Sequence, residues 1–276
     1  MRIPNRNLRR TDNEDLYVFD MCALSADEVL LACGRAGLRV VSLHTAQLVA
    51  HEPNAIREVY NVAFDAHTDT LLLLLWAPTG YYYQLVSLRR NASEWLEVQR
   101  LDTRIRHHSF YKFMLNFAVC DSRVLLGGVG GNTYVFAVTA EHTLRDAGNV
   151  TWQNSFNWFT CTRRDGVPLI AFSHNTSVSL LRLTSLPLHL EPLATVSLNE
   201  PRRLLFREDL LLVADWNRAT DTGAIVSFRA SDNALTERRV LLDALAGVGV
   251  GAWALASDRL VLWNKESEEL LVYAFT

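Results

Sequence analysis

The sequence predicts an all-β fold made of six similar sheets with four strands each. Six times along the 276 residues, a turn containing Asp is followed by a short apolar run, a polar or glycine gap and a second apolar run. Apolar runs of four to six residues between turn residues are typical of strands, because helices are usually longer. A further candidate strand precedes each turn, and a weaker one follows most of the second runs. Each unit therefore has four strands, which we call a, b, c and d in chain order.

The repeat is marked by its turn residues Asp27, Asp69, Asp121, Asp165, Asp209 and Asp258. Four-stranded units of roughly 40 to 50 residues are typical of β-propeller blades. Strand b is the most continuously apolar, as in the run of five leucines from Leu71 to Leu75, and such strands are covered on both faces. Strand d is the most polar, as expected at the outer edge of a blade.

The two ends of the chain predict how the last sheet is completed. The sixth unit stops at Thr276, directly after its strand c, while an extra extended segment from Ile3 to Arg9 precedes the first strand a. We expect this N-terminal segment to supply the missing strand. The sequence thus predicts one domain over residues 1–276, folded as a six-bladed β-propeller, with seven blades as the alternative.

Several segments resemble WD-repeat propellers. Residues 38–50 followed by 59–65 resemble their passage from strand c through strand d to the next strand a, and residues 259–264 fit the same pattern. The resemblance covers nearly the whole chain, although the chain has no Trp-Asp dipeptide and no Gly-His pair. It implies a divergent WD-like propeller that acts as a protein-interaction scaffold. Residues 211–216 with 223–228 are also similar to blades of six-bladed lactonase-type hydrolases.

Composition and charge narrow the class of protein. Apolar residues make up 49% of the chain, which excludes intrinsic disorder. The 27 basic and 30 acidic residues give a net charge of −3, so there is no overall attraction to nucleic acid or to an anionic membrane. No apolar run follows the basic N-terminus, and the uncharged stretch 71–88 is interrupted by Pro78 and Gly80. We therefore expect a cytoplasmic or nuclear protein with no membrane contact.

The sequence offers no catalytic or metal-binding motif. The histidines do not fall at metal-ligand spacings, and the four cysteines match neither a zinc pattern nor a dense disulfide framework. The glycine-rich residues 127–131 link two strands, so they lack the helix N-terminus that binds phosphate. We expect no catalytic residue, no metal, no cofactor and no small-molecule substrate. The alternative follows from the lactonase resemblance, which implies a divalent metal in a central channel near Asn61, Asp65, Asn116 and Asn157.

One face of the predicted propeller is the candidate surface for a partner. The d–a and b–c connections gather on that face, and they combine Arg with Trp and Tyr, the composition of interface hot spots. Five acidic residues fall on the same face and reduce its positive charge: Glu52, Glu58, Glu200, Asp215 and Asp221. The candidate partner-binding residues are Arg57, Trp76, Tyr81, Tyr82, Arg104, Arg106, His107, His108, Lys112, Arg202, Arg203, Trp216 and Arg218.

These observations predict a non-enzymatic scaffold that binds other protein subunits or an acidic peptide within an intracellular complex. The second hypothesis is the channel-metal hydrolase. The third is an adaptor for nucleic acid, which the net charge disfavours.

Overall fold

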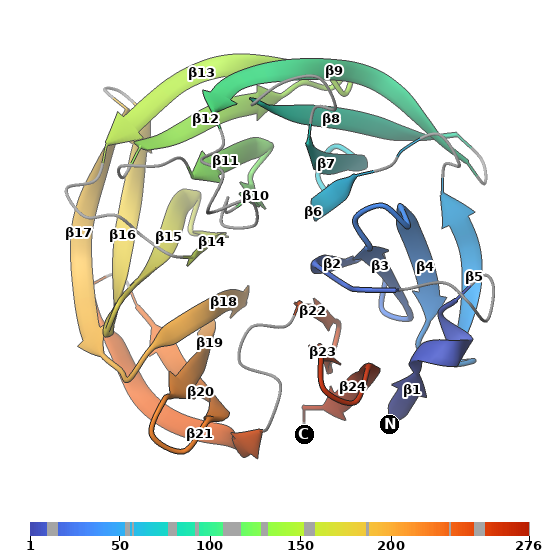
Figure 1. Cartoon of the computed structure of the whole chain (residues 1–276). Helices are drawn as coiled ribbons and strands as arrows, with labels where there is room; N and C mark the ends of the chain where they lie inside the picture. The colour runs from blue at the N-terminus through green and yellow to red at the C-terminus, as the bar shows by residue number, and fades with distance from the viewer. Residues whose placement is uncertain are drawn as a thin grey trace. The chain divides into compact units, whose positions relative to one another are not determined.

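A computed structural model describes most of the chain (Figure 1). The residues it describes are 1–9, 16–52, 56, 58–76, 82–91, 94–106, 117–127, 132–151, 158–185, 188–231, 233–245 and 252–275. The predicted fold class is confirmed, because the strands form six sheets of four antiparallel strands each, arranged as a β-propeller. Within these residues the helical structure is the single turn η1 (Asn5–Asn7), and no helix is long and apolar enough to cross a membrane.

The chain divides into two compact units. Unit 1 contains Met1–Phe113, Thr139–Leu144 and Gly251–Thr276, and unit 2 contains Met114–Val138 and Arg145–Val250. The sheets of unit 1 are β2 (Asp20–Ala23), β3 (Glu28–Ala32), β4 (Leu38–Ser42) and β5 (Gln47–Glu52); β6 (Val59–Asp65), β7 (Thr70–Trp76), β8 (Tyr82–Asn91) and β9 (Glu94–Arg106); and β1 (Arg2–Pro4), β24 (Glu269–Ala274), β23 (Arg259–Asn264) and β22 (Trp253–Ala256).

The remaining three sheets follow one another along the chain. They are β10 (Phe117–Cys120), β11 (Arg123–Gly127), β12 (Asn132–Val138) and β13 (Leu144–Thr151); β14 (Trp158–Arg164), β15 (Val167–His174), β16 (Ser177–Ser185) and β17 (Leu188–Ser197); and β18 (Pro201–Arg207), β19 (Leu210–Asn217), β20 (Thr222–Ala230) and β21 (Leu235–Leu245).

Strand b of each sheet is buried, as its apolar sequence predicts. In β7 the residues from Thr70 to Leu75 are all buried, and Leu71, Leu73 and Leu75 pack against the neighbouring sheet β2–β5. Burying one such leucine contributes about 2 kcal/mol relative to leaving it exposed. The outer strand β13, in contrast, is buried only at Leu144 and Val150. The core thus lies between adjacent sheets, and the connections are left to form surface.

The N-terminal segment completes the last sheet, as predicted. Strand β1 pairs antiparallel with β24, with Ile3 opposite Leu270, and the side chain of Ile3 is fully buried. The backbone nitrogen of Met1 donates to the carbonyl of Val272 at 2.8 Å. The strand is shorter than the expected segment, since it ends at Pro4, which has no amide hydrogen to donate.

All six repeat aspartates lie in turns between the first and second strands of their sheets. Asp69, Asp121 and Asp165 have φ values of 51°, 53° and 48°. Asp tolerates this left-handed conformation better than most residues, because its short side chain bonds to nearby backbone. The backbone conformation thus accounts for Asp in these three turns, whereas Glu208 and Ser257 take it beside Asp209 and Asp258.

Candidate partner-binding site

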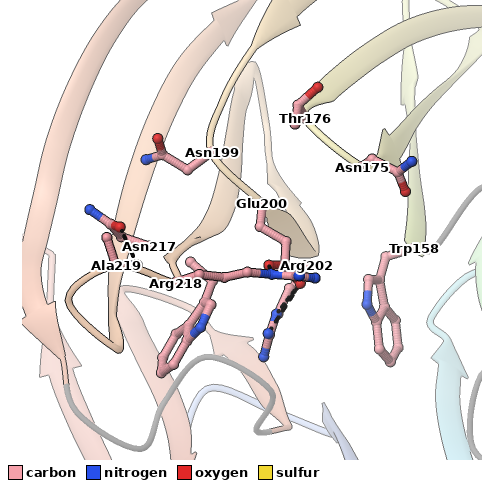
Figure 2. A pocket seen from close by; sticks show the side chains of 10 residues that line it. Trp158, Asn175, Thr176, Asn199, Glu200, Arg202, Asn217, Arg218 and Ala219 are labelled. Atoms are coloured by element: carbon pink, nitrogen blue, oxygen red, sulfur yellow. Dashed lines mark hydrogen bonds and ion pairs between the residues drawn. The ribbon is translucent and has the colours of Figure 1, made fainter.

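A pocket of about 900 Å³ lies in unit 2, between the sheets β14–β17 and β18–β21. It is lined by Trp158, Asn175, Thr176, Asn199, Glu200, Arg202, Trp216, Asn217, Arg218 and Ala219. Trp158 lies in β14, Arg202 in β18, and Trp216 and Asn217 at the end of β19. The other six residues belong to the d–a connection before β18 and to two b–c turns. Figure 2 shows Trp158 and Asn175 on one side, Asn199 and Asn217 on the other, and Glu200 with Arg202 between them.

The connection before β18 is held in place by Asp215. This carboxylate is buried and accepts the backbone N–H groups of Asn199 and Glu200, both at 2.9 Å. It also accepts the side-chain amide of Asn199 at 3.1 Å. The backbone nitrogen of Trp216 donates to the carbonyl of Glu200 at 3.1 Å. Three N–H donors offset the cost of burying a charge, and the connection is thereby fixed to strand β19.

A β-bulge directs two arginines out of the strand ladder. Pro201 lies opposite Asp215, but the next pair is Leu204 opposite Val213, so β18 contains one extra residue. A bulge changes the direction of side chains on the longer strand. Arg202 and Arg203 occupy this bulge.

Each of these arginines lies over a tryptophan ring. The guanidinium carbon of Arg202 is 4.9 Å from the ring centroid of Trp216, and that of Arg203 is 4.3 Å from the ring centroid of Trp158. Cation–π contacts of this kind are worth about 0.5–2 kcal/mol. They hold both rings in position as walls of the pocket.

The carboxylate of Glu200 joins two arginines across the pocket. Its Oε1 accepts from Nη2 of Arg202 at 3.1 Å, and its Oε2 accepts from Nε of Arg218. The bond from Arg218, together with the charge of Arg202, lowers the pKa of Glu200. The side chains of Glu200 and Arg202 are 19% and 22% exposed, whereas that of Arg218 is 81% exposed. Arg218 is therefore the part of this network that solvent reaches most easily.

The ring of Trp216 packs over a glycine on the neighbouring strand. Trp216 lies opposite Gly223 in the β19–β20 ladder. A Cβ atom at Gly223 would come within 3.3 Å of Cε3 of Trp216 and 3.6 Å of the carbonyl oxygen of Leu245. Glycine at this position leaves room for the indole.

Unit 1 contains the same backbone arrangement. Glu58 immediately precedes β6, and its carbonyl accepts the backbone N–H of Trp76 at 3.3 Å. Val59 lies opposite Leu75, and a bulge follows before Asn61. By strand register, Glu58 and Trp76 therefore correspond to the Glu and Trp of the unit 2 pocket.

The side chains around Glu58 form a different environment. Oε1 of Glu58 accepts from Nε of Arg35 at 3.1 Å, and Oε2 accepts the hydroxyl of Tyr60 at 2.5 Å. The ring of Tyr60 lies 6.3 Å from that of Trp76 and 5.0 Å from that of Phe19, measured between centroids. Burial and the bond to Glu58 raise the pKa of Tyr60 above its usual range. The result is an aromatic cluster with one ion pair.

The structure brings together only some of the residues predicted to bind a partner. Arg202, Trp216 and Arg218 line the pocket, and Arg203 supports one of its walls. Trp76 and Tyr82 lie in unit 1, at facing ends of β7 and β8. Arg104 and Arg106 belong to strand β9 and not to the connection after it. The other five predicted residues lie outside the described residues: Arg57, Tyr81, His107, His108 and Lys112.

Sequence reasoning missed the role of Asp215 and the part played by Trp158. Asp215 and Glu200 entered the prediction only as charges that weaken a positive face, whereas the structure shows that they position it. For Glu200 a signal was available, since a Glu directly precedes strand a and a Trp lies at the end of strand b in both the second and the fifth unit. Trp158 gave no comparable signal, because its place in the pocket depends on the neighbouring sheet.

The residues suggested for a channel metal serve other contacts. The side-chain amide of Asn61 donates to Oδ2 of Asp20 at 3.2 Å, and Oδ2 of Asp65 accepts the hydroxyl of Thr68 at 2.6 Å. Asn116 and Asn157 lie outside the described residues. In the part of the chain that the structure describes, no group of three or more His, Cys, Asp or Glu side chains could hold a metal ion.

Comparison with solved structures identifies the class of the fold. The β-propeller domain of Cps50 (Swd1) from Myceliophteria thermophila is 9% identical, with a TM-score of 0.57 over 95% of this chain and 98% of that one. A chain of the Mitotic Checkpoint Complex is 10% identical, with a TM-score of 0.58 over 100% and 94%. A putative oxidoreductase (glucose dehydrogenase) from a Thermus species is 13% identical, with a TM-score of 0.60 over 96% and 100%.

At these identities the similarity establishes the fold and nothing beyond it. No protein-family model matches the sequence, and no curated protein is similar to it. The chain is thus a six-bladed β-propeller. Unit 2 has a pocket of arginine and tryptophan side chains on the face formed by its d–a and b–c connections, which we call the loop face.

Proposed function

We propose that this propeller is a non-enzymatic interaction scaffold of the WD-repeat kind, a subunit of a cytoplasmic or nuclear complex. It binds a partner polypeptide at the pocket of unit 2. The observation that carries this proposal is the convergence of Trp158, Arg202, Trp216 and Arg218 on one pocket. Trp and Arg are the residue types most enriched among interface hot spots.

The pocket suits this role because its parts are held before any partner arrives. Asp215 fixes the connection, and the stacked arginines fix the indole rings. Fixed side chains lose little conformational entropy on binding, so more of the contact energy appears as affinity. A volume of about 900 Å³ can hold a few side chains of a partner. That one similar propeller belongs to a complex is consistent with the proposal.

Quantitative affinity purification from the organism that encodes the protein tests the proposal. The bait is the full chain, compared with Arg202→Gln/Arg218→Gln and with the control Arg238→Gln/Arg239→Gln, whose arginines are exposed on the outer strand β21. We expect at least one partner to be retained by the wild type and the control but lost from the pocket variant. Identical sets of partners for all three proteins would contradict the proposal.

The alternative is a propeller hydrolase with a channel metal, and a second measurement separates it from the scaffold. The purified protein is analysed for bound divalent metal and assayed against a panel of lactones and aryl esters. The scaffold proposal expects less than stoichiometric metal and no turnover above that of heat-denatured protein. One metal per chain together with metal-dependent turnover would replace the scaffold with the enzyme.

A further inference from the structure

The charges at the unit 2 pocket are not balanced. Among the described residues that line it, the guanidinium groups of Arg202 and Arg218 share the single carboxylate of Glu200. The carboxylate of Asp215 is buried and directed at three N–H donors, so it contributes little to the field in the pocket. One positive charge is left over, which favours an anionic ligand.

Arg218 is the group that can receive this ligand. Its Nε donates to Glu200, and it makes no other polar contact within the described part of the chain. The bond through Nε leaves both terminal nitrogens of the fork for another acceptor, and a guanidinium can bind a carboxylate through two parallel hydrogen bonds. With 81% of its side chain exposed, Arg218 is accessible from solvent.

The surroundings of Arg218 suit a peptide better than a small anion. The half-buried ring of Trp216 and the ring of Trp158 are apolar walls. Asn175 and Thr176 add exposed polar groups at the turn between β15 and β16. Apolar walls beside a single positive charge match a segment that carries one acidic side chain among apolar or aromatic neighbours.

Resting on the function proposed above, we propose that the pocket binds an acidic segment of a partner polypeptide, one Asp or Glu carboxylate of which pairs with Arg218. In the free protein Glu200 holds Arg218 in the orientation that receives this carboxylate. A single carboxylate matches the single surplus charge, whereas a phosphate dianion or a nucleic-acid backbone would bring more negative charge than the pocket offsets.

Peptide selection on the full chain tests this inference. A displayed library of random 12-residue peptides is selected on the wild-type protein, and the enriched peptides are synthesised with a fluorescein label. Affinities are measured by fluorescence anisotropy for each peptide and for its version with every Asp and Glu changed to Asn and Gln. The protein variants are Arg218→Gln, Arg218→Lys, Trp158→Ala and the exposed control Arg238→Gln, each checked for folding by circular dichroism.

We expect the selected peptides to share an acidic residue. Changing that residue to its amide, or Arg218 to Gln, weakens binding about 10-fold, as for loss of a charged hydrogen-bonded pair. The two changes together cost no more than either one alone, because they remove the same interaction. Arg218→Lys retains part of the affinity, and Arg238→Gln retains all of it.

Two other results would be decisive against the inference. Neutral peptides that lose affinity on Trp158→Ala but not on Arg218→Gln would overturn the acidic partner and leave the scaffold function standing. A phosphoserine version of the peptide that binds more than about 10-fold tighter than the Asp or Glu peptide would also overturn the carboxylate partner and leave the scaffold function standing. If the affinity of no selected peptide depends on a pocket residue, both this inference and the proposed binding of a partner at the pocket are wrong.

Discussion

The loop faces of units 1 and 2 use one backbone arrangement with different side chains. Glu58 and Glu200 each precede strand a, and each accepts the N–H of a tryptophan at the end of strand b. Two residues further on, unit 1 has Tyr60 and unit 2 has Arg202, and each of these side chains both bonds to the Glu carboxylate and contacts the tryptophan ring. The presence of Tyr60 in unit 1 and Arg202 in unit 2 at equivalent positions is therefore one difference between the aromatic cluster and the cationic pocket.

A second difference concerns how the connection is held. Opposite the first residue of strand a, unit 1 has Leu75 and unit 2 has Asp215. Leu75 is simply buried, whereas Asp215 accepts three hydrogen bonds from the connection. The pocket of unit 2 thus depends on a buried charge for its shape, and the cluster of unit 1 depends on packing.

The largest effect should come from removing that charge. We expect Asp215→Ala to lower the free energy of unfolding by about 3 kcal/mol, because it removes the buried carboxylate that accepts three hydrogen bonds from the connection. Urea unfolding followed by tryptophan fluorescence measures the loss. The control Glu94→Ala, at an exposed position of β9, should stay within about 0.5 kcal/mol of the wild type. Equal stability of the two variants would show that Asp215 does not hold the connection.

An intermediate effect should follow from replacing Arg202 of unit 2 with the tyrosine that unit 1 has at the equivalent position. With an acidic peptide selected on the wild type as the probe, we expect Arg202→Tyr to weaken binding about 10-fold, because the surplus positive charge is lost. Arg202→Lys keeps the charge but loses the planar fork that stacks on Trp216, so it should fall in between. Fluorescence anisotropy reports both affinities. Unchanged binding by Arg202→Tyr would mean that the contrast between Tyr60 and Arg202 has no role in recognition.

The smallest effect should be an opposite response of the two faces to pH. The pKa of Glu200 is lowered by folding, so its contribution is present above the usual Glu pKa and is lost as the pH falls through the folded-state value. The pKa of Tyr60 is raised, so its contribution is present below the usual Tyr pKa and is lost as the pH rises through the folded-state value. Both groups are only partly buried, so solvent screening limits each contribution to about 1 kcal/mol or less.

Urea unfolding at a series of pH values checks this contrast. The stability difference between wild type and Glu200→Gln should disappear in acid, and the difference between wild type and Tyr60→Phe should disappear in alkali. If both differences change in the same pH range, the two carboxylate networks do not act as described.

The sequence predicted the sheets well because each strand is encoded locally. Runs such as Leu71–Leu75 are too short for helices and are bounded by turn residues, and the extra segment around Ile3 matched a missing strand in the last sheet. The candidate site was predicted in part, since sorting the connections by face selected Arg202, Trp216 and Arg218. The function of Asp215 could not be predicted in this way, because hydrogen bonds to an adjacent connection depend on strand register and not on residue type.

The sequence by itself determined the repeat, the number of sheets and the kinds of side chain available on the loop face, because apolar periodicity and turn residues act over a few positions. The tertiary structure alone decided which of these side chains meet. The bulges in β6 and β18 redirect Tyr60 and Arg202, and packing of the sheet β14–β17 against β18–β21 brings Trp158 to Arg203. Contacts between residues so far apart in the chain require the folded sheets to place them.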